Sequence, residues 1–235
     1  VIEEYTGVLD CLADELYKRE EISSRFETFD FSDRFMKICI ETGDVHKQFF
    51  DFSLPFSGVK LDTPFWTGQA VLNAFTADSL LDCVESLIGP EIYSNPVQHV
   101  RIKPPEQILP KNKFGDPILG ATLWHQDQGV VIEEADKTRM LTVWFALQDV
   151  SISHGPLKLV PGSHKPGLLA HCERQQGGRE IPEKLFEVKS TTPLPVNRGD
   201  VIFLHKQMVH GSLENVSDTI RWSFDLRYNP IGQHT

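Results

Sequence analysis

The stretch Leu123-Trp124-His125-Gln126-Asp127-Gln128 is the most informative part of the sequence. On an extended strand, side chains alternate between two faces, so His125 and Asp127 are predicted to project to one side and Gln126 to the other. An imidazole beside a carboxylate supplies two ligands of a facial site for a divalent metal. Because a His-x-Asp tripeptide is also common on surface strands, the pair predicts a metal site only together with a third ligand.

His210 is the candidate third ligand. It follows residues 199–204, which predict a turn and a buried strand, and Gly211 is expected to permit a sharp turn out of a strand there. His205 lies five residues earlier and would face the opposite side of a regular strand. Structural or solvent roles are expected for His205 and for the remaining histidines, which are His46, His99, His154, His164, His171 and His234.

Two imidazoles and one carboxylate leave three adjacent positions of an octahedron open. That arrangement is typical of Fe(II) centres that bind an organic co-substrate and dioxygen, whereas structural zinc sites are more often closed by four cysteine-rich ligands. The four cysteines form no Cys-x-x-Cys pair, so they indicate neither a zinc knot nor a disulfide scaffold and fit a reducing cytoplasm. They are Cys11, Cys39, Cys83 and Cys172.

Helices are predicted in the first third of the chain. Leu9, Leu12 and Leu16 share one face of a helix, and the apolar pattern over 80–88 predicts another. Asp78 or Thr76 is expected to cap that second helix and Gly89-Pro90 to end it. The phenylalanine-rich segment between the two helices is interpreted as helix-packing surface and irregular structure.

From about residue 91, short β-rich runs alternate with turn residues, as in a sandwich or barrel. These runs cover 97–103, 120–125, 141–147, 157–160, 201–204 and 220–228. Helices followed by strands indicate an α+β chain, and 235 residues without a visible repeat or linker favour one domain, helical over about 1–90 and a β-barrel over about 91–235. The long connection over 163–198 predicts either a lid over the site or a surface excursion.

Charge and hydropathy narrow the class of partner. A net charge of −10 argues against nucleic acid, and the one local basic cluster, Lys103, Lys111 and Lys113, is interpreted as a solvated loop. No run approaches the roughly 20 apolar residues of a membrane span, and no basic-then-apolar leader opens the chain. Val1-Ile2 is typical of the end of a strand, so part of the N-terminus is expected to be missing.

Together, these motifs resemble the phytanoyl-CoA dioxygenase family of Fe(II)/2-oxoglutarate oxygenases. The resemblance covers about residues 97–230, and the N-terminal third matches only in being helical. Five segments carry it, in the family's order: Lys103-Pro104-Pro105; His125-Gln126-Asp127; Gly155-Pro156-Leu157 with Pro161-Gly162-Ser163-His164-Lys165; Gly199-Asp200-Val201-Ile202-Phe203; and His210-Gly211-Ser212 followed by Arg221.

The resemblance implies a double-stranded β-helix, or jelly-roll barrel, flanked by the N-terminal helices. It places Fe(II) on His125, Asp127 and His210 inside the open end of the barrel. It also implies that 2-oxoglutarate chelates the iron through its keto and C1 carboxylate oxygens, that dioxygen is consumed, and that ascorbate is a stimulant.

The resemblance assigns roles to Arg221, Ser212 and Trp144, and strand geometry gives an expectation for a fourth residue, Arg227. Arg221 stands where the family keeps the arginine that grips the distal carboxylate, as a guanidinium can with two parallel hydrogen bonds. Ser212 matches a hydroxyl that helps to hold the same carboxylate. Trp144 matches an aromatic of the co-substrate pocket, although plain core is an equal alternative. Arg227 would share the face of Arg221 but sit about 20 Å away, and is interpreted as a structural or rim residue.

The implied activity is oxidation of a C–H bond of a small molecule, with release of succinate and carbon dioxide. Asp127 favours hydroxylation over halogenation, because halogenating relatives have a small residue there; desaturation, epoxidation and ring formation stay open. The family name suggests an acyl-CoA, but the lack of a strong basic cluster favours a free metabolite or lipid-derived acid. The oligomeric state is not predicted.

Two other classes of function explain part of the pattern. A metal-dependent isomerase or hydrolase, using zinc or manganese, explains the triad but leaves Arg221 and Ser212 without a purpose. A non-catalytic barrel acting in binding explains neither the triad nor Arg221. Dependence on 2-oxoglutarate separates the first class from an oxygenase, and failure to bind iron would favour the second.

Overall fold

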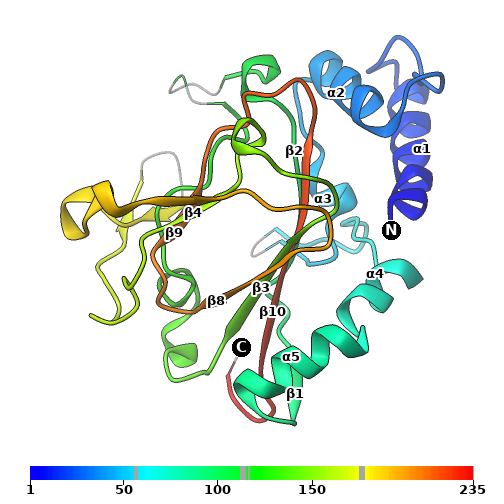
Figure 1. Cartoon of the computed structure of the whole chain (residues 1–235). Coiled ribbons are helices and arrows are strands. Elements are labelled where there is room, and N and C mark those ends of the chain that lie inside the picture. Colours follow the sequence, from blue (N-terminus) through cyan, green and yellow to red (C-terminus); the bar gives the residue numbers. More distant parts are fainter. Residues whose placement is uncertain (56–57, 112–114, 116, 175–177, 235) are drawn as a thin grey trace.

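The computed structural model describes residues 1–55, 58–111, 115, 117–174 and 178–234. Helices precede strands, as the sequence predicts (Figure 1). The α-helices are α1 (Ile2–Lys18), α2 (Phe31–Thr42), α3 (Lys47–Phe50), α4 (Gln69–Phe75) and α5 (Asp78–Ile88). The strands are β1 (Ile92–Ser94), β2 (His99–Lys103), β3 (Leu141–Ala146), β4 (Leu157–Leu159), β5 (Cys172–Glu173), β6 (Arg179–Glu180), β7 (Thr192–Leu194), β8 (Val201–His205), β9 (His210–Ser212) and β10 (Arg221–Pro230). Short 3₁₀ turns are Glu106–Ile108, Asp127–Val130, Glu133–Ala135, Ile152–His154, Glu183–Leu185 and Val188–Ser190.

The predicted N-terminal helix is confirmed, but it begins earlier than expected. Leu9, Leu12 and Leu16 lie on the buried face of α1. The expectation of a strand end at Val1-Ile2 is wrong, because the Tyr5 amide already donates to the Val1 carbonyl at 2.9 Å, the bond of a first helical turn. The apolar start of the chain therefore belongs to a helix that packs on the sheet.

The second predicted helix, α5, is confirmed and its predicted caps are half right. Gly89 ends it with φ at +97°, a conformation that favours glycine. Neither proposed N-cap serves, because Ala77 is the capping residue, Asp78 is already helical and Thr76 closes α4. The phenylalanine-rich segment does pack against the helices, with Phe50 and Phe52 in the main core.

In the described residues, the strands form two larger antiparallel sheets and a two-stranded one, β5–β6. In the five-stranded sheet, β10 pairs with both β1 and β2 on one side and with β3 on the other, and β8 lies beyond β3. The smaller sheet has the order β7-β4-β9. A mixed α+β fold is thus confirmed. The run predicted over 120–125 is wrong as a regular strand, since it pairs with β9 through an isolated bridge between His125 and His210 and a further bond from the Ser212 amide to the Thr122 carbonyl.

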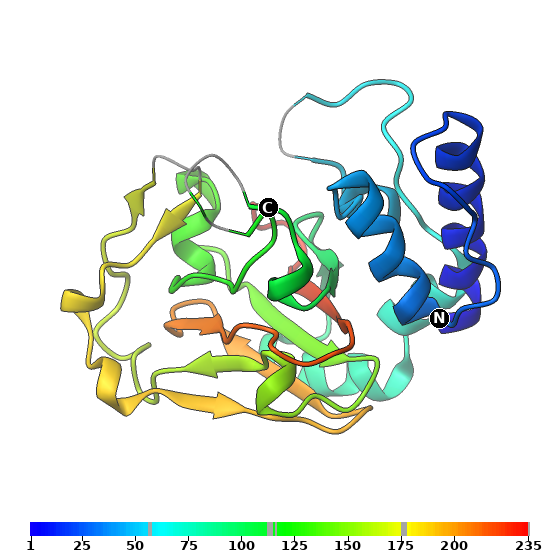
Figure 2. The same cartoon turned by 90° about the horizontal axis from the view of Figure 1, so that it is seen from above.

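The large sheet separates two environments. Trp222, Phe224 and Leu226 of β10 join the core formed with the N-terminal helices, which lie along one side of the strands (Figure 2). The alternate β10 residues point the other way, because successive strand side chains take opposite faces. On the far side, Trp144 and Leu204 pack against Leu157 of the small sheet. The space between the two sheets therefore receives the polar face of β10.

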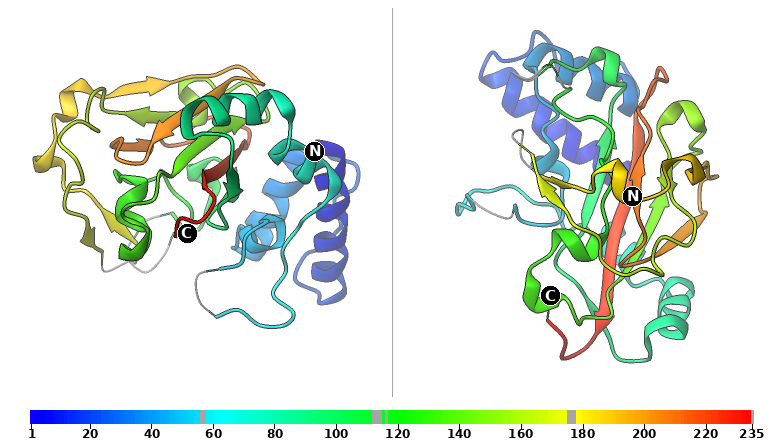
Figure 3. Two further views of the ribbon diagram at one scale, coloured as in Figure 1. Left: turned by 90° about the horizontal axis from the view of Figure 1, so that it is seen from below. Right: turned by 90° about the vertical axis from the view of Figure 1, so that its left-hand side faces the viewer.

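The long connection over 163–198 contains regular secondary structure. It contains the β5–β6 hairpin and β7, and the hairpin lies at the end of the molecule away from α1 (Figure 3). Its Leu169, Ile181 and Phe186 pack with Trp124, directly before the predicted metal ligands. Gln175, Gln176 and Gly177 lie outside the described residues. No helix in the described part of the chain is long and apolar enough to cross a membrane.

Candidate metal centre

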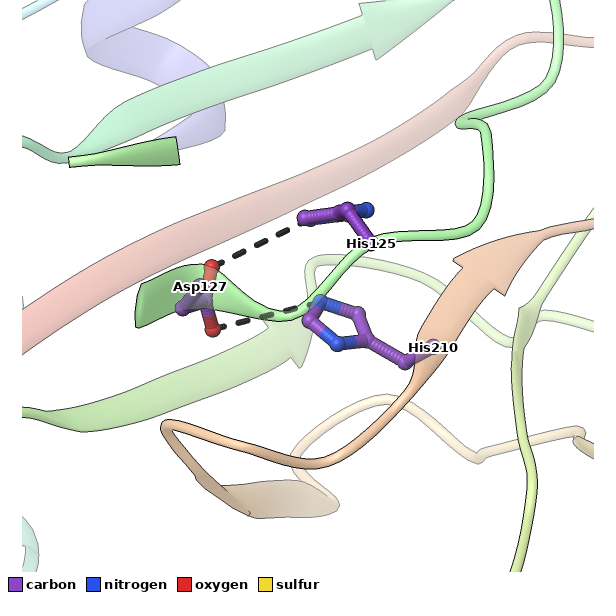
Figure 4. Close-up of side chains that lie close together, drawn as sticks. All are labelled: His125, Asp127 and His210. Atoms are coloured by element: carbon purple, nitrogen blue, oxygen red, sulfur yellow. Dashed lines mark ion pairs between the residues drawn. The ribbon is translucent and has the colours of Figure 1, made fainter. Parts of the chain in front are cut away.

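The structure brings His125, Asp127 and His210 together. The backbones of His125 and His210 exchange two hydrogen bonds of 2.9 Å, which sets their rings side by side with centroids 4.2 Å apart. Asp127 faces both rings (Figure 4), and each Nε2 lies 3.9 Å from a carboxylate oxygen. One ligand atom from each residue falls within 4.8 Å of the others, a spacing at which a single ion can contact all three.

Gln126 holds this arrangement in place. Its backbone is extended, with φ −115° and ψ 137°, so the alternation of 125 and 127 holds although no regular strand forms. Its buried side chain donates to Gly167 and Gln207 and accepts from the Leu169 amide at 2.8 Å. The metal loop is thereby fixed to two distant segments.

Gly211 has a different role from the predicted one. His210–Ser212 is itself strand β9, and the glycine has no positive φ. A Cβ at this position would lie 2.6 Å from the Thr122 carbonyl oxygen. Glycine is required because two backbones approach closely beside the metal ligands.

Both histidines are set up to bind metal through Nε2. The Nδ1 atom of His125 lies 2.8 Å from the Leu123 carbonyl and that of His210 lies 2.9 Å from the Met208 carbonyl. A carbonyl can only accept, so Nδ1 carries the proton and Nε2 keeps its lone pair. Burial, followed by the neighbouring His210, lowers the pKa of His125 to about 3, which keeps its imidazole neutral.

Asp127 is ionised and held at both oxygens. Its Oδ1 accepts from Arg227 Nη2 at 2.6 Å and its Oδ2 accepts from Thr142 Oγ1 at 2.6 Å. Burial alone would raise the pKa of this carboxyl, but Arg227 and the two histidines hold it below its usual range. Arg227 is only 4% exposed, so it is no rim residue; it supports a predicted metal ligand directly.

The other end of β10 carries a buried cation that forms no ion pair with a described carboxylate. Arg221 is 2% exposed; its Nη1 donates to Ser223 Oγ, and its guanidinium lies 5.7 Å from the centre of the Trp144 ring. Among the described residues, its buried Nε has no hydrogen-bond partner. Burial lowers the pKa of Arg221 to about 9. Trp144 belongs to the core and also lines the cavity that contains both histidines, so its two predicted readings are compatible.

Lys103 corrects the interpretation of a solvated basic loop. It is buried at the end of β2, and its Nζ donates to Gly120, Thr122 and Ser212, the last at 3.2 Å. Burial and the nearby Arg221 lower the pKa of Lys103 well below its ordinary value. Lys111 is exposed, and Lys113 lies outside the described residues. Ser212 also accepts from the Thr122 amide at 2.7 Å, so the hydroxyl links β9 to this cation.

These residues fit the implied metal and co-substrate. Two imidazole nitrogens and one carboxylate, with no sulfur, suit Fe(II). An unpaired buried cation is costly, and here Arg221 and Lys103 form no ion pair with any described carboxylate. A ligand carboxylate between Arg221, Lys103 and Ser212 would satisfy both cations.

Sequence reasoning missed three contributors: Lys103, Thr142 and Arg227 in its actual role. It did place the remaining histidines outside the site. His99 nevertheless has a carboxylate partner, since its Nδ1 lies 2.7 Å from Asp51 Oδ2. The rings of His164 and His205 contact each other at a tilt, with centroids 5.4 Å apart. Asp51 lies 48 residues from His99, too far along the chain for a spacing argument.

Comparison with known proteins places this geometry in a family. The family model described as phytanoyl-CoA dioxygenase (PhyH) matches residues 61–223. "Phytanoyl-CoA dioxygenase 1" of Oryza sativa subsp. japonica is 32% identical over 130 residues, covering 54% of this chain and 46% of the rice protein. The chain thus spans less than half the length of that relative.

Two solved structures show a similar fold. The non-heme monooxygenase ThoJ, in its apo form, has a TM-score of 0.53 at 25% identity, covering 68% of this chain and 55% of that protein. The epimerase SnoN, in complex with Fe³⁺, α-ketoglutarate and nogalamycin RO, has a TM-score of 0.53 at 23% identity. The match covers 69% of this chain and 59% of that protein. Because the family model matches more than half of this chain, the chain belongs to the phytanoyl-CoA dioxygenase family.

Proposed function

We propose that this protein is an Fe(II)/2-oxoglutarate-dependent oxygenase that hydroxylates a C–H bond of a small molecule, on a double-stranded β-helix. His125, Asp127 and His210 would hold the iron. The observation that carries the proposal is the pair of buried cations, Arg221 and Lys103, which lie beside a three-ligand metal site and form no ion pair with a described carboxylate. An isomerase or hydrolase gives these cations no purpose.

Each residue contributes a defined task. Arg221, Lys103 and Ser212 would bind the distal carboxylate of 2-oxoglutarate, and Trp144 would form a wall of its pocket. Arg227 and Thr142 keep Asp127 ionised and oriented. The carbonyls of Leu123 and Met208 keep the protons of the two imidazoles on Nδ1. Iron and 2-oxoglutarate, when bound, supply oxygen activation coupled to oxidative decarboxylation.

The test is turnover of the iron-loaded protein with 2-oxoglutarate under oxygen, in the presence of candidate small molecules. We expect succinate to form only with iron, oxygen and 2-oxoglutarate together, and ¹⁸O from labelled dioxygen to enter the product. Substrate conversion with zinc or manganese in the absence of 2-oxoglutarate would instead support an isomerase or hydrolase. Succinate without ¹⁸O in the product would replace hydroxylation by another 2-oxoglutarate-dependent outcome, such as the epimerisation named for SnoN.

A further inference from the structure

Arg101 is the most exposed of the three arginines that meet at this site. It lies on β2 two residues before Lys103 and therefore shares its face. Its side chain is 37% exposed, against 5% for Arg227. Its recorded hydrogen-bond partner among the described residues is Asp225, at 3.4 Å, a long N–H···O distance. Asp225 also lies 3.9 Å from Arg227, so Arg101 shares a carboxylate that is already engaged.

Two cavities meet at Arg101. The inner one is lined by His125, His210 and Arg221, so it is the metal and co-substrate cavity. The outer one measures about 210 Å³ and lies between α3 and β2. Arg101 lines both cavities, so a molecule held in the outer cavity would lie beside a guanidinium that also borders the metal cavity.

The charge of the site favours an anion. Four cationic side chains meet there, and two carboxylates, Asp127 and Asp225, face them. The cations are Arg101, Lys103, Arg221 and Arg227. A divalent metal and a dicarboxylate cancel one another, so loading the site leaves the positive excess in place. Glu106 offsets part of the charge of Lys103 from outside, and Asp51 is occupied by His99 and by the Val100 amide.

The outer cavity adds cationic and apolar surface. Lys47, exposed on α3, stands at this cavity, and Leu54 and Leu119 supply apolar walls. The chain as a whole has a net charge of −10, whereas the charge at this cavity is positive. Such a local positive charge concentrates anions at the site. The cavity volume lies below the roughly 300–1,000 Å³ of pockets for drug-sized ligands, which argues for a small molecule.

We propose that the substrate is a small organic acid whose carboxylate binds Arg101, with its apolar part in the outer cavity. This inference rests on the proposed function and names the substrate class for the same site. Arg101 is then a specificity-determining residue. The remaining arginines do not compete for this anion, because Arg221 serves the co-substrate and Arg227 is committed to Asp127.

The experiment is calorimetric titration of the protein loaded anaerobically with Fe(II) and 2-oxoglutarate. The probes are hexanoic, octanoic, benzoic and phenylacetic acids, each paired with its amide. We expect at least one acid to bind about tenfold more tightly than its amide, because a charge-assisted hydrogen bond is lost in the amide. Arg101→Gln should remove this preference, and Arg101→Lys should keep part of it. Arg19→Gln is the matched control, since it removes the same charge from an exposed position directly after α1.

Three results would overturn the inference: no acid binds, acids and amides bind equally, or Arg101→Gln behaves like Arg19→Gln. An Arg101→Gln variant that weakens 2-oxoglutarate as much as the acid would assign Arg101 to the co-substrate instead. Circular dichroism of each variant verifies folding, and Arg101→Lys carries the test if Arg101→Gln does not fold. If the wild-type protein fails to bind 2-oxoglutarate but still prefers acids through Arg101, the proposed function fails and the anion site stands.

Discussion

Each end of β10 carries a buried arginine, but only one of the two arginines is paired with a carboxylate of the described residues. At one end, Arg227 lies opposite Thr142 in the sheet register, and both donate to Asp127. At the other end, Arg221 lies opposite Lys103, so two buried cations are neighbours and neither forms an ion pair with a described carboxylate. A buried charge that is paired supports the fold, whereas one that is left unpaired indicates a ligand. The difference separates the metal-supporting end from the co-substrate end.

The largest expected effect is on metal binding itself. Replacing His125 or His210 by alanine removes one of three ligands, so we expect loss of measurable Fe(II) binding after dialysis, quantified by metal analysis. His205→Ala is the control, because this exposed ring lies outside the triad. Retention of iron by either ligand variant would refute the assignment of the paired end to a metal.

Stability should distinguish the two arginines. Arg227→Met leaves the Asp127 carboxylate buried without its cation, and we expect the free energy of unfolding of the metal-free protein to fall by about 3–5 kcal/mol. Arg221→Met removes an unpaired cation and should leave this free energy unchanged or raise it. Urea unfolding of both variants measures the contrast, and equal destabilisation would remove the basis of the comparison.

For co-substrate binding we expect the opposite order of effects, with the loss of Arg221 mattering more than the loss of Arg227. Arg221→Ala removes a buried charge-assisted contact worth roughly 2–5 kcal/mol, so we expect the KM for 2-oxoglutarate to rise about thirtyfold to several thousandfold. Arg221→Lys should be intermediate, because lysine keeps the charge but not the bidentate geometry. An unchanged KM would mean that the distal carboxylate binds elsewhere.

Thr142 offers a finer test of the paired end. Thr142→Val keeps the shape but removes the hydroxyl that donates to Asp127, and we expect metal affinity to weaken about tenfold. Thr142→Ser should restore it. If valine and serine give the same affinity, the hydroxyl does not orient the carboxylate.

Ser212→Ala should give the smallest effect. The hydroxyl accepts from the Thr122 amide and contacts Lys103, so its loss should raise the KM for 2-oxoglutarate by a factor corresponding to about 1 kcal/mol. Steady-state kinetics at saturating iron measure it. An effect as large as that of Arg221→Ala would show that Ser212 also positions the strand.

What the sequence could predict depended on how local the determining contacts are. The alternation around Gln126 predicted the shared side of His125 and Asp127, and the family motifs led to His210, Arg221 and Ser212, with Trp144 as a further match to the family. His125, His210, Arg221 and Trp144 line one cavity, and Ser212 accepts from Lys103. The amphipathic patterns of α1 and α5 were equally readable, because a helix buries one face whatever its neighbours are.

The missed contributors depend on long-range register. Thr142 reaches Asp127 because it lies opposite Arg227, and Lys103 is buried because it lies opposite Arg221. No spacing within a single segment encodes such pairings, so Arg227 was expected to be a structural or rim residue and Lys103 to lie in a solvated loop. The prediction of a strand over 120–125 was wrong for a related reason. Its β-like residues lie against β9, with an isolated bridge at His125, and are not a strand of either larger sheet.

The most direct test of the central claim is an anaerobic titration of the metal-free protein with Fe(II) and then with 2-oxoglutarate, followed by visible absorption. A weak charge-transfer band should appear only when both are present, because it requires the keto acid to chelate the iron. The band should be absent in His210→Ala, and admission of oxygen should discharge it as succinate forms. Iron binding without any band would contradict the oxygenase assignment and leave the unpaired cations at Arg221 and Lys103 without their proposed ligand.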